Sequence, residues 1–141
     1  MPVVETLSVP VTITGVRQAI EAFERFGRAH GVSRGTEWRV MLALDEILSN
    51  IVLHGASADG QGGIDVTFTL DAESVAVEIV DASGAFNPLL AGPPDTTSAL
   101  QDRKPGGLGI ALVRQLMDET SYERRDNRNH LLLRCGAHAD R

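Results

Sequence analysis

Residues 42–55 read LALDEILSNIVLHG and place a carboxylate and an amide four positions apart in a segment with helical spacing. Side chains four residues apart lie on the same face of a helix. We therefore expect Glu46 and Asn50 beside the apolar stripe of this helix, at the rim of the core. A carboxylate there can deprotonate a hydroxyl group, and an amide oxygen can bind a hard cation. Taken alone, the pattern favours the alternative, a solvated polar face on an ordinary amphipathic helix.

A second motif, DASGAFNP at residues 81–88, follows an apolar segment. Asp81 ends a predicted strand, and Gly84 lies in a loop of small residues. A carboxylate that emerges from a buried strand into such a loop can accept a hydrogen bond from a ligand amine. An Asx-type turn that begins at Asp81 explains the motif equally well.

A third motif, GGLG at residues 106–109, opens a segment with helical periodicity. Glycines expose consecutive backbone N–H groups, and a helix start adds partial positive charge, so the two together favour phosphate. The alternative is a flexible hinge before a helix. This motif is the strongest of the three signals.

Hydrophobic periodicity predicts the remaining elements. Strands are expected over residues 3–13, 64–70, 75–81, 119–125 and 130–134, and helices over 16–30, 36–54 and 108–117. Thr36 is the expected N-cap of the second helix, and residues 82–107 are expected to form a long mobile loop. The order predicts an α/β (α+β) two-layer sandwich, with helices on one face of a mixed, mostly antiparallel sheet.

Composition limits the class of protein. The chain has 141 residues, 43% of them hydrophobic, and a formal net charge of −6. These values predict one domain over residues 1–135 with a disordered polar tail at 136–141, and the charge opposes direct binding to nucleic acid or an anionic membrane. A single cysteine forbids an intramolecular disulfide, and the first residues lack the pattern of a signal peptide, so we expect a cytoplasmic protein.

The order and spacing of the three motifs resemble the nucleotide-binding boxes of the GHKL ATPase superfamily, which shares the Bergerat fold. That resemblance implies ATP bound under a mobile lid, here about residues 88–106. Four stretches are similar to the small bacterial anti-sigma-factor serine kinases: LALDEILSNIVLHG, the FNP at 86–88, KPGGLGIALVRQLMDETSYER at 104–124 and RNHLLL at 128–133.

The resemblance implies a role for each matching residue. Glu46 would be the general base for the attacking hydroxyl, Asn50 the Mg²⁺ ligand and Asp81 the residue that binds the adenine amine, with Gly84 in the adjoining loop. The remaining roles concern the phosphates and the lid. Gly107, Leu108 and Gly109 would donate backbone hydrogen bonds to the phosphates, Gly106 would permit lid closure, and Arg103 or Lys104 would neutralise charge on the γ-phosphate.

Two positions depart from the family pattern. Ser83 stands where relatives carry glycine, and the glycine comes one place later at Gly84. Leu132 stands where many relatives have a threonine near the adenine in the last strand. These departures bear on nucleotide affinity and on whether kinase activity is retained.

By resemblance, the chain is expected to be an ATP-dependent protein serine/threonine kinase and anti-sigma factor in a partner-switching module that regulates transcription. It would phosphorylate a serine of a STAS-domain anti-anti-sigma protein, bind a sigma factor, use ATP and Mg²⁺ with release of ADP, and form a homodimer. The alternative is a nucleotide-binding regulatory protein that sequesters a partner without significant kinase activity.

Overall fold

The computed structural model of the chain describes residues 1–55, 62–90 and 107–138. Its elements follow in the order β1 (Val3–Pro10), α1 (Ile13–His30), α2 (Arg34–Asn50), the π-helical turn η1 (Ile51–Gly55), β2 (Gly63–Leu70), β3 (Ser74–Asp81), the 3-10 turn η2 (Pro88–Leu90), α3 (Gly107–Leu116), β4 (Glu119–Arg125) and β5 (Arg128–Gly136). The strands form a five-stranded sheet of order β1-β2-β3-β5-β4. Every neighbouring pair is antiparallel.

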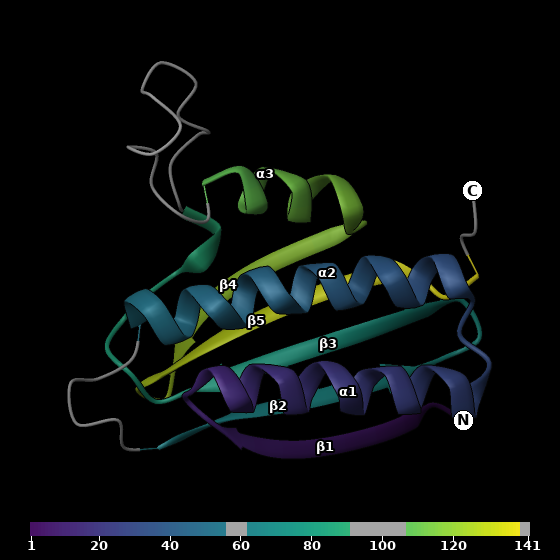
Figure 1. The fold of residues 1–141 in the computed structure, drawn as a ribbon, viewed down its shortest axis with the longest axis horizontal. Coiled ribbons are helices and arrows are strands. Elements are labelled where there is room, and N and C mark those ends of the chain that lie inside the picture. Colours follow the sequence, from purple (N-terminus) through teal and green to yellow (C-terminus); the bar gives the residue numbers. More distant parts are fainter. Residues whose placement is uncertain (56–61, 91–106, 139–141) are drawn as a thin grey trace.

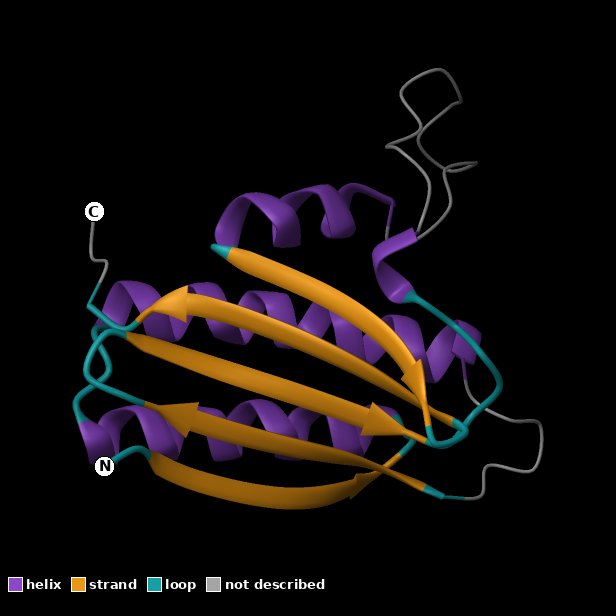
Figure 2. Ribbon diagram, turned by 180° about the vertical axis from the view of Figure 1, so that it is seen from behind, coloured by secondary structure: helices purple, strands orange, loops and turns teal. Residues whose placement is uncertain are grey.

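The predicted two-layer sandwich is confirmed. Helices α1 and α2 cross one face of the sheet side by side, and α3 lies next to α2 (Figure 1). Seen from behind, the opposite face of the sheet is bare of helices in the described part of the chain (Figure 2). The sheet therefore has one face in the core and one face that no described helix covers.

The core forms where the apolar stripes of the helices meet the helix-facing side of the sheet. Phe68 of β2 lies with its ring centroid 5.2 Å from that of Phe23 and 5.4 Å from that of Phe26. All three side chains are fully buried. Burial of a side chain of this size contributes roughly 1.5–3 kcal/mol. The i, i+3 spacing of α1 thus produces the packing that its sequence predicts.

Helix α1 begins at Ile13, earlier than predicted, because Thr12 caps it. The Thr12 hydroxyl accepts a hydrogen bond from the Gly15 backbone N–H at 3.0 Å, so the first strand ends at Pro10. A Cβ at Gly15 would lie 1.9 Å from the Pro10 carbonyl oxygen, so only glycine permits this tight entry into the helix.

The predicted N-cap of α2 is wrong. Ser33 caps the helix by accepting a hydrogen bond from the Thr36 backbone N–H at 3.3 Å. Thr36 is instead buried inside the first turn, where its hydroxyl donates to the Gly136 carbonyl at 2.6 Å. Both residue types suit a cap, and tertiary contact with the last strand decides between them. The helix ends at Asn50 and continues as the π-helical turn η1.

The last hairpin is tighter than predicted. Strand β4 has the predicted bounds, but β5 begins at Arg128 because the turn consists of only two residues, Asp126 and Asn127, with φ values of 55° and 62°. Such a two-residue turn with positive φ matches the twist of paired strands. The strand also runs on to Gly136, and Ala137 is buried, so the first residues of the expected disordered tail are ordered.

Candidate functional site

The predicted site residues that the structure describes lie at one end of the sandwich. The C-terminal end of α2, the N-terminal end of α3 and the end of β3 come together at the left of Figure 1. Glu46 and Asn50 come from α2, Gly109 from α3 and Asp81 from β3. Three segments far apart in the sequence therefore supply one region.

Glu46 and Asn50 form a hydrogen-bonded pair on α2. The Asn50 Nδ2 donates to Glu46 Oε2 at 3.0 Å, as expected for residues four apart on one helix face. Asn50 is 4% exposed, while Glu46 is half-buried. Because a carboxylate only accepts, the amide must turn its NH₂ toward Glu46. Its oxygen is consequently the end directed away from Glu46 and suited to a cation.

The Glu46 carboxylate also lies against the first turn of α3. A Cβ built at Gly109 would lie 1.9 Å from Glu46 Oε1 and 2.0 Å from its carboxyl carbon. Only a residue without a side chain allows the carboxylate to come so close to this backbone. The start of α3 carries partial positive charge from its unpaired N–H groups. The base candidate and the predicted phosphate-binding turn are therefore neighbours.

Burial raises the pKa of the Glu46 carboxyl above the usual value for glutamate, and the nearby charge of Asp45 adds to the effect. The hydrogen bond from Asn50 acts in the opposite direction and offsets only part of it. A carboxylate with a raised pKa is a stronger base, and its titration moves toward neutral pH. This environment suits a group that takes a proton from a hydroxyl.

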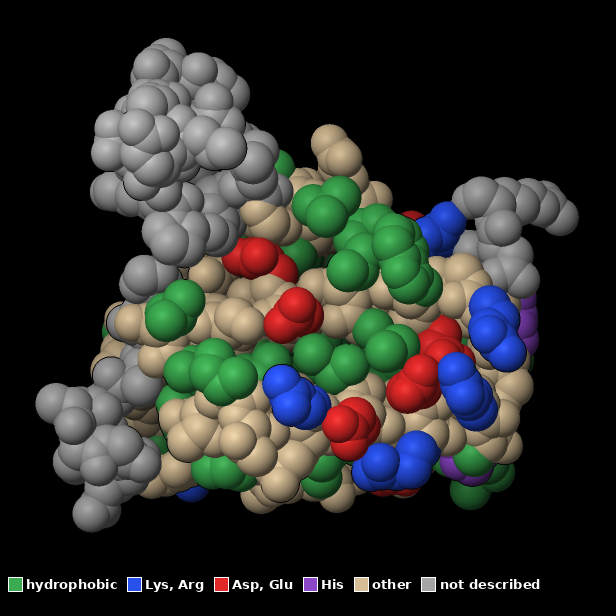
Figure 3. All heavy atoms as spheres, in the orientation of Figure 1, with side chains coloured by type: hydrophobic (Ala, Val, Ile, Leu, Met, Phe, Trp, Pro, Cys, Tyr) green, Lys and Arg blue, Asp and Glu red, His purple; other side chains and the backbone are tan. Residues whose placement is uncertain are grey.

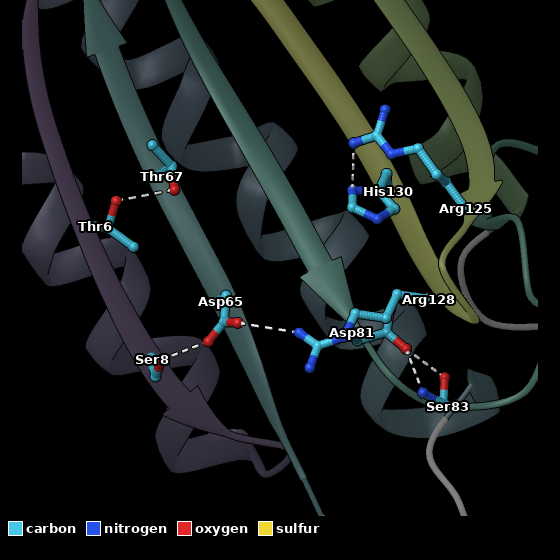
Figure 4. A network of polar contacts seen from close by, with 9 residues as sticks. All are labelled: Thr6, Ser8, Asp65, Thr67, Asp81, Ser83, Arg125, Arg128 and His130. Carbon is cyan, nitrogen blue, oxygen red and sulfur yellow. Dashed lines mark hydrogen bonds and ion pairs between the residues drawn. The ribbon is translucent and has the colours of Figure 1, made fainter.

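Asp81 lies at the base of the site, 4% exposed. Its Oδ1 accepts from the Ser83 hydroxyl and from the Ser83 backbone N–H at 3.0 Å (Figure 4). The Asx-type turn considered above is thus present. The Asp81 Oδ2 has no hydrogen-bond partner within residues 1–55, 62–90 and 107–138. Among the described residues, Oδ1 accepts all of the hydrogen bonds made to this carboxylate, which leaves Oδ2 as the candidate acceptor for a ligand.

Asn129 is the site residue that the sequence analysis missed. It is paired directly with Asp81 across β3 and β5, is 3% exposed, and donates from Nδ2 to Asp81 Oδ1 at 3.1 Å. The four-residue turn predicted over 126–129 placed it outside the strand. A two-residue turn at Asp126 and Asn127 would have included Asn129 in the strand, on the same face as the buried Leu131. That shared face is the signal that could have identified it.

The predicted place of Leu132 near the adenine is wrong. Leu132 is paired with Glu78, and strand alternation directs both away from the helices. Asn129, three residues earlier, is the last-strand residue beside Asp81. Of the two departures from the family pattern, only Ser83 lies at the site.

The remaining predicted residues fall into two groups. The Gly84 carbonyl accepts from Asn129 Nδ2 at 3.0 Å, and a Cβ at Gly84 would meet no atom within 4 Å. Gly107 and Leu108 form the start of α3. Arg103, Lys104 and Gly106 lie outside the described residues, so their predicted roles remain predictions.

On the face that bears the helices, Lys and Arg side chains are intermixed with Asp and Glu over the middle and right of Figure 3, with hydrophobic side chains between them, and acidic side chains lie nearer the left, toward the site. Among the described residues, no group of three His, Cys, Asp or Glu side chains is arranged to hold a metal ion. None of the described helices has the length and hydropathy to cross a bilayer.

Comparison with known families decides the assignment. Residues 9–135 match the family described as histidine kinase-like ATPase domain. The chain belongs to this family. The serine/threonine-protein kinase BtrW of Bordetella bronchiseptica is 33% identical over 129 residues, which cover 92% of this chain and 91% of BtrW. The resemblance to the GHKL superfamily and its small kinases is thereby confirmed, and family membership implies nucleotide binding.

Two solved structures share the fold of this ATPase-family chain. A Mycobacterium tuberculosis chain that holds RsbU and RsbW domains matches with a TM-score of 0.67 and 18% identity, over 96% of this chain and 32% of that longer one. SiaB, in the SiaB–SiaC complex from Pseudomonas aeruginosa, matches with a TM-score of 0.53 and 16% identity, over 94% of this chain and 89% of its own. Both confirm the architecture.

Proposed function

We propose that this protein is an ATP-dependent protein serine/threonine kinase and anti-sigma factor of a partner-switching module. The observation that supports the proposal is the Glu46–Asn50 pair, hydrogen-bonded at 3.0 Å and lying against the first turn of α3. A protein kinase site needs a group that accepts the proton of the substrate hydroxyl close to the γ-phosphate. The closeness of Glu46 to the first turn of α3 and the raised pKa of its carboxyl support this role.

ATP would be bound through its adenine at one end of the site and through its phosphates at the other. The free Oδ2 of Asp81 would accept the adenine amine, and the small loop residue Gly84 leaves open space beside it. The backbone N–H groups of residues 107–109 would donate to the phosphates at the start of α3. The adenine end thus relies on one carboxylate oxygen, and the phosphate end relies on backbone donors.

The transfer step follows from these positions. The serine hydroxyl of the partner attacks the γ-phosphorus of ATP, so that a new O–P bond forms as the bond between the γ-phosphorus and the β–γ bridging oxygen breaks. Glu46 takes the hydroxyl proton, and ADP leaves. General-base assistance of this kind contributes about 10²–10⁴-fold to a rate.

The Asn50 side chain fits a magnesium site. Its NH₂ is held by Glu46, so its oxygen is the hard donor that Mg²⁺ prefers. Magnesium bound with nucleotide usually keeps few protein ligands, which agrees with a single amide here. When bound, the ion would neutralise charge on the phosphates.

The partner is proposed from relatives. BtrW is named a serine/threonine-protein kinase, and SiaB was crystallised with SiaC. We infer that the substrate is a serine of a STAS-domain anti-anti-sigma protein, that a sigma factor binds in competition with it, and that the kinase acts as a homodimer in the cytoplasm.

Phosphoryl transfer with Glu46→Gln tests the proposal. The variant keeps the size of the side chain but removes the base, so transfer of radiolabelled γ-phosphate to the STAS-domain partner should fall by about 10²–10⁴-fold. ATP affinity by calorimetry should stay within about threefold, because Glu46 is not a proposed ligand of ATP. Asp45→Asn, on the exposed neighbour, is the matched control and should retain transfer. Undiminished transfer by Glu46→Gln would refute the role of Glu46.

The same preparation tests the alternative function. Calorimetry of the wild-type protein with ATP, with and without Mg²⁺, should show magnesium-dependent binding that Asp81→Asn abolishes. Binding of ATP and capture of the partner without any phosphoryl transfer would identify a nucleotide-gated sequestering protein instead. Transfer that depends on Glu46 would exclude that alternative.

A further inference from the structure

Arg124 of β4 connects separate parts of the site through one guanidinium group. Its Nη1 donates to the Ser83 carbonyl at 2.7 Å and to Asn129 Oδ1 at 3.1 Å. Its Nη2 donates to Asn127 Oδ1 at 3.1 Å, in the β4–β5 turn. The planar fork of arginine suits such simultaneous contacts. The loop after β3, the start of β5 and the hairpin turn are therefore fixed relative to one another.

Asn129 is the residue through which this linkage reaches Asp81. Register pairing places Asp81, Asn129 and Arg124 in one row across β3, β5 and β4. The preceding helix-facing row in the same strands holds Ile79, Leu131 and Tyr122. The sheet thus changes from a largely apolar row to a polar row at the end where the site lies, and the polar row is buried at its centre.

Every described polar group of the Asn129 side chain is engaged. Nδ2 donates to Asp81 Oδ1 at 3.1 Å, to the Ser83 hydroxyl at 3.3 Å and to the Gly84 carbonyl at 3.0 Å. Oδ1 accepts from the Tyr122 hydroxyl, from Arg124 and from the Phe86 backbone N–H at 3.2 Å. The donors on Oδ1 require the amide to present its nitrogen, and not its oxygen, to Asp81.

We propose that Arg124 and Asn129 are positioning residues that make the site specific for a purine with an exocyclic 6-amino group. They hold Asp81 with Oδ1 saturated and Oδ2 directed to the ligand. The inference rests on the proposed function, because it takes the ligand to be a nucleoside triphosphate whose base meets Asp81. Neither side chain needs to touch the nucleotide for this effect.

The discrimination follows from hydrogen-bond chemistry. Rotation of the Asp81 carboxylate would give up the contacts with Ser83 and Asn129, so Oδ2 stays an acceptor with a fixed direction. Adenine offers an N–H at that point. Hypoxanthine offers a carbonyl oxygen, so two acceptors would face each other and neither would be satisfied. A site built around a fixed polar group rejects a ligand that leaves the group unpaired more strongly than an apolar pocket does.

The test compares ATP with inosine triphosphate, which differs at the 6-position of the base. Dissociation constants for both are measured by calorimetry on the wild-type protein, Asn129→Asp, Arg124→Gln and Arg125→Gln. Arg125 is the matched control, because it is the next residue on the same strand, half exposed, and paired with Glu123 at 3.1 Å instead of with the Asp81 row. Thermal unfolding checks that each variant is folded.

The wild-type protein should prefer ATP. Asn129→Asp should lower the preference, measured as the dissociation constant for inosine triphosphate divided by that for ATP, by about tenfold to a hundredfold. Arg124→Gln should lower it by roughly three- to tenfold, since Asn129 keeps its other partners. A merely structural role would weaken both nucleotides equally and leave the ratio unchanged. Arg125→Gln should leave both affinities unchanged.

Two failures are distinguishable. Wild-type protein that binds neither nucleotide would overturn the proposed function itself. Wild-type protein that prefers ATP, with the same preference in Asn129→Asp and Arg124→Gln, would overturn this inference and leave the kinase proposal standing. If Asn129→Asp does not fold, Arg124→Gln alone decides between these results.

Discussion

The Asp81 end and the Glu46 end of the site are constructed in different ways. Around Asp81, side chains from three neighbouring strands and the loop after β3 form one hydrogen-bonded network. Around Glu46, the described residues supply one side-chain hydrogen bond, from Asn50, and close contact with the Gly109 backbone. The first end depends on strand register, and the second depends on how two helices pack.

From this difference we expect nucleotide recognition at the Asp81 end and chemistry at the Glu46 end. A saturated network on a sheet can hold one acceptor in a fixed direction before a ligand arrives, which suits selection of a base. A carboxylate held by the hydrogen bond from Asn50 beside a helix start can adjust when phosphate occupies that place. Variants at the Glu46 end should therefore affect catalysis and magnesium, and variants at the Asp81 end should affect the choice and affinity of nucleotide.

The largest expected effect comes from Gly109→Ala. The added methyl group would overlap the Glu46 carboxylate, with 1.9 Å between the new Cβ and Oε1, so either α3 or Glu46 must move. We expect phosphoryl transfer to fall by at least about 100-fold, because misplacement of a catalytic group by about 1 Å has that effect. Transfer assays at saturating ATP measure it.

Gly84→Ala is the matched control for that substitution. A Cβ at Gly84 meets no atom within 4 Å, and its φ is not in the left-handed region. Because Gly84 lies beside the proposed adenine position, the control is measured at saturating ATP, where a change in affinity does not limit the rate, and transfer should then change less than about threefold. Equal losses in the two variants would show that close contact with Glu46 is not what makes Gly109 necessary.

The next effect concerns magnesium. Asn50→Ala removes the proposed ligand oxygen and also the hydrogen bond to Glu46 Oε2. We expect the increase in ATP affinity caused by Mg²⁺ to shrink by about tenfold to a hundredfold, while magnesium-free affinity changes little. Calorimetry with Mg²⁺ and with a chelator measures the two values. An unchanged magnesium effect would place the ion on other groups.

Much of the fold and most described site residues were predictable because they depend on local patterns. The stripe of α1 and the bounds of β4 follow from spacing alone. Glu46 and Asn50 follow from one helical turn. The family match over residues 9–135 agrees with the order of motifs that linked these segments in the sequence analysis.

The parts that were missed depend on contacts between segments. Ser33 and Thr36 are both suitable caps, and the hydrogen bond from Thr36 to Gly136, far along the chain, decides which one is used. Asn129 was missed because the hairpin turn has two residues instead of four, so β5 begins at Arg128 and includes Asn129. Leu132 was placed by resemblance alone, and its pairing with Glu78 puts it on the other face of the sheet. Local sequence cannot fix strand register when the turn is read wrongly.

A smaller effect is expected on the pH dependence of transfer. The base must be deprotonated, and burial raises the pKa of Glu46, so activity should fall on acidification at a higher pH than for an ordinary glutamate. Asp45→Asn removes a charge that raises this pKa and should shift the acid limb to lower pH. Transfer rates at saturating ATP, measured from about pH 4, near the ordinary pKa of a carboxyl group, to about pH 8, give the shift of the acid limb. An acid limb that does not move would show that another group controls it.

The same pKa shift has a stability consequence of known sign. A carboxyl whose pKa is higher in the folded protein than in the unfolded chain stabilises the fold at pH values below its unfolded-state pKa. This contribution is lost as the pH rises through its folded-state pKa. Glu46→Gln should therefore gain stability relative to the wild-type protein as pH rises from acid to neutral. Thermal unfolding at both pH values measures the trend, and the opposite trend would contradict the raised pKa.

The smallest expected effect is that of Ser83→Ala at the Asp81 end. The hydroxyl is one of the donors to Asp81 Oδ1, but the substitution leaves in place the two other donors, the Ser83 backbone N–H and Asn129 Nδ2, which lie at 3.0 and 3.1 Å in the wild-type protein. Loss of one hydrogen bond within such a network should weaken ATP binding by only about two- to tenfold. Calorimetry measures the affinity, with Asp81→Asn as the reference for complete loss. If Ser83→Ala approached that reference, the serine hydroxyl would be essential for holding Asp81, and the strand network alone would not suffice. A small loss would instead mean that register across β3, β5 and β4 fixes the acceptor, so that serine is tolerated where relatives carry glycine.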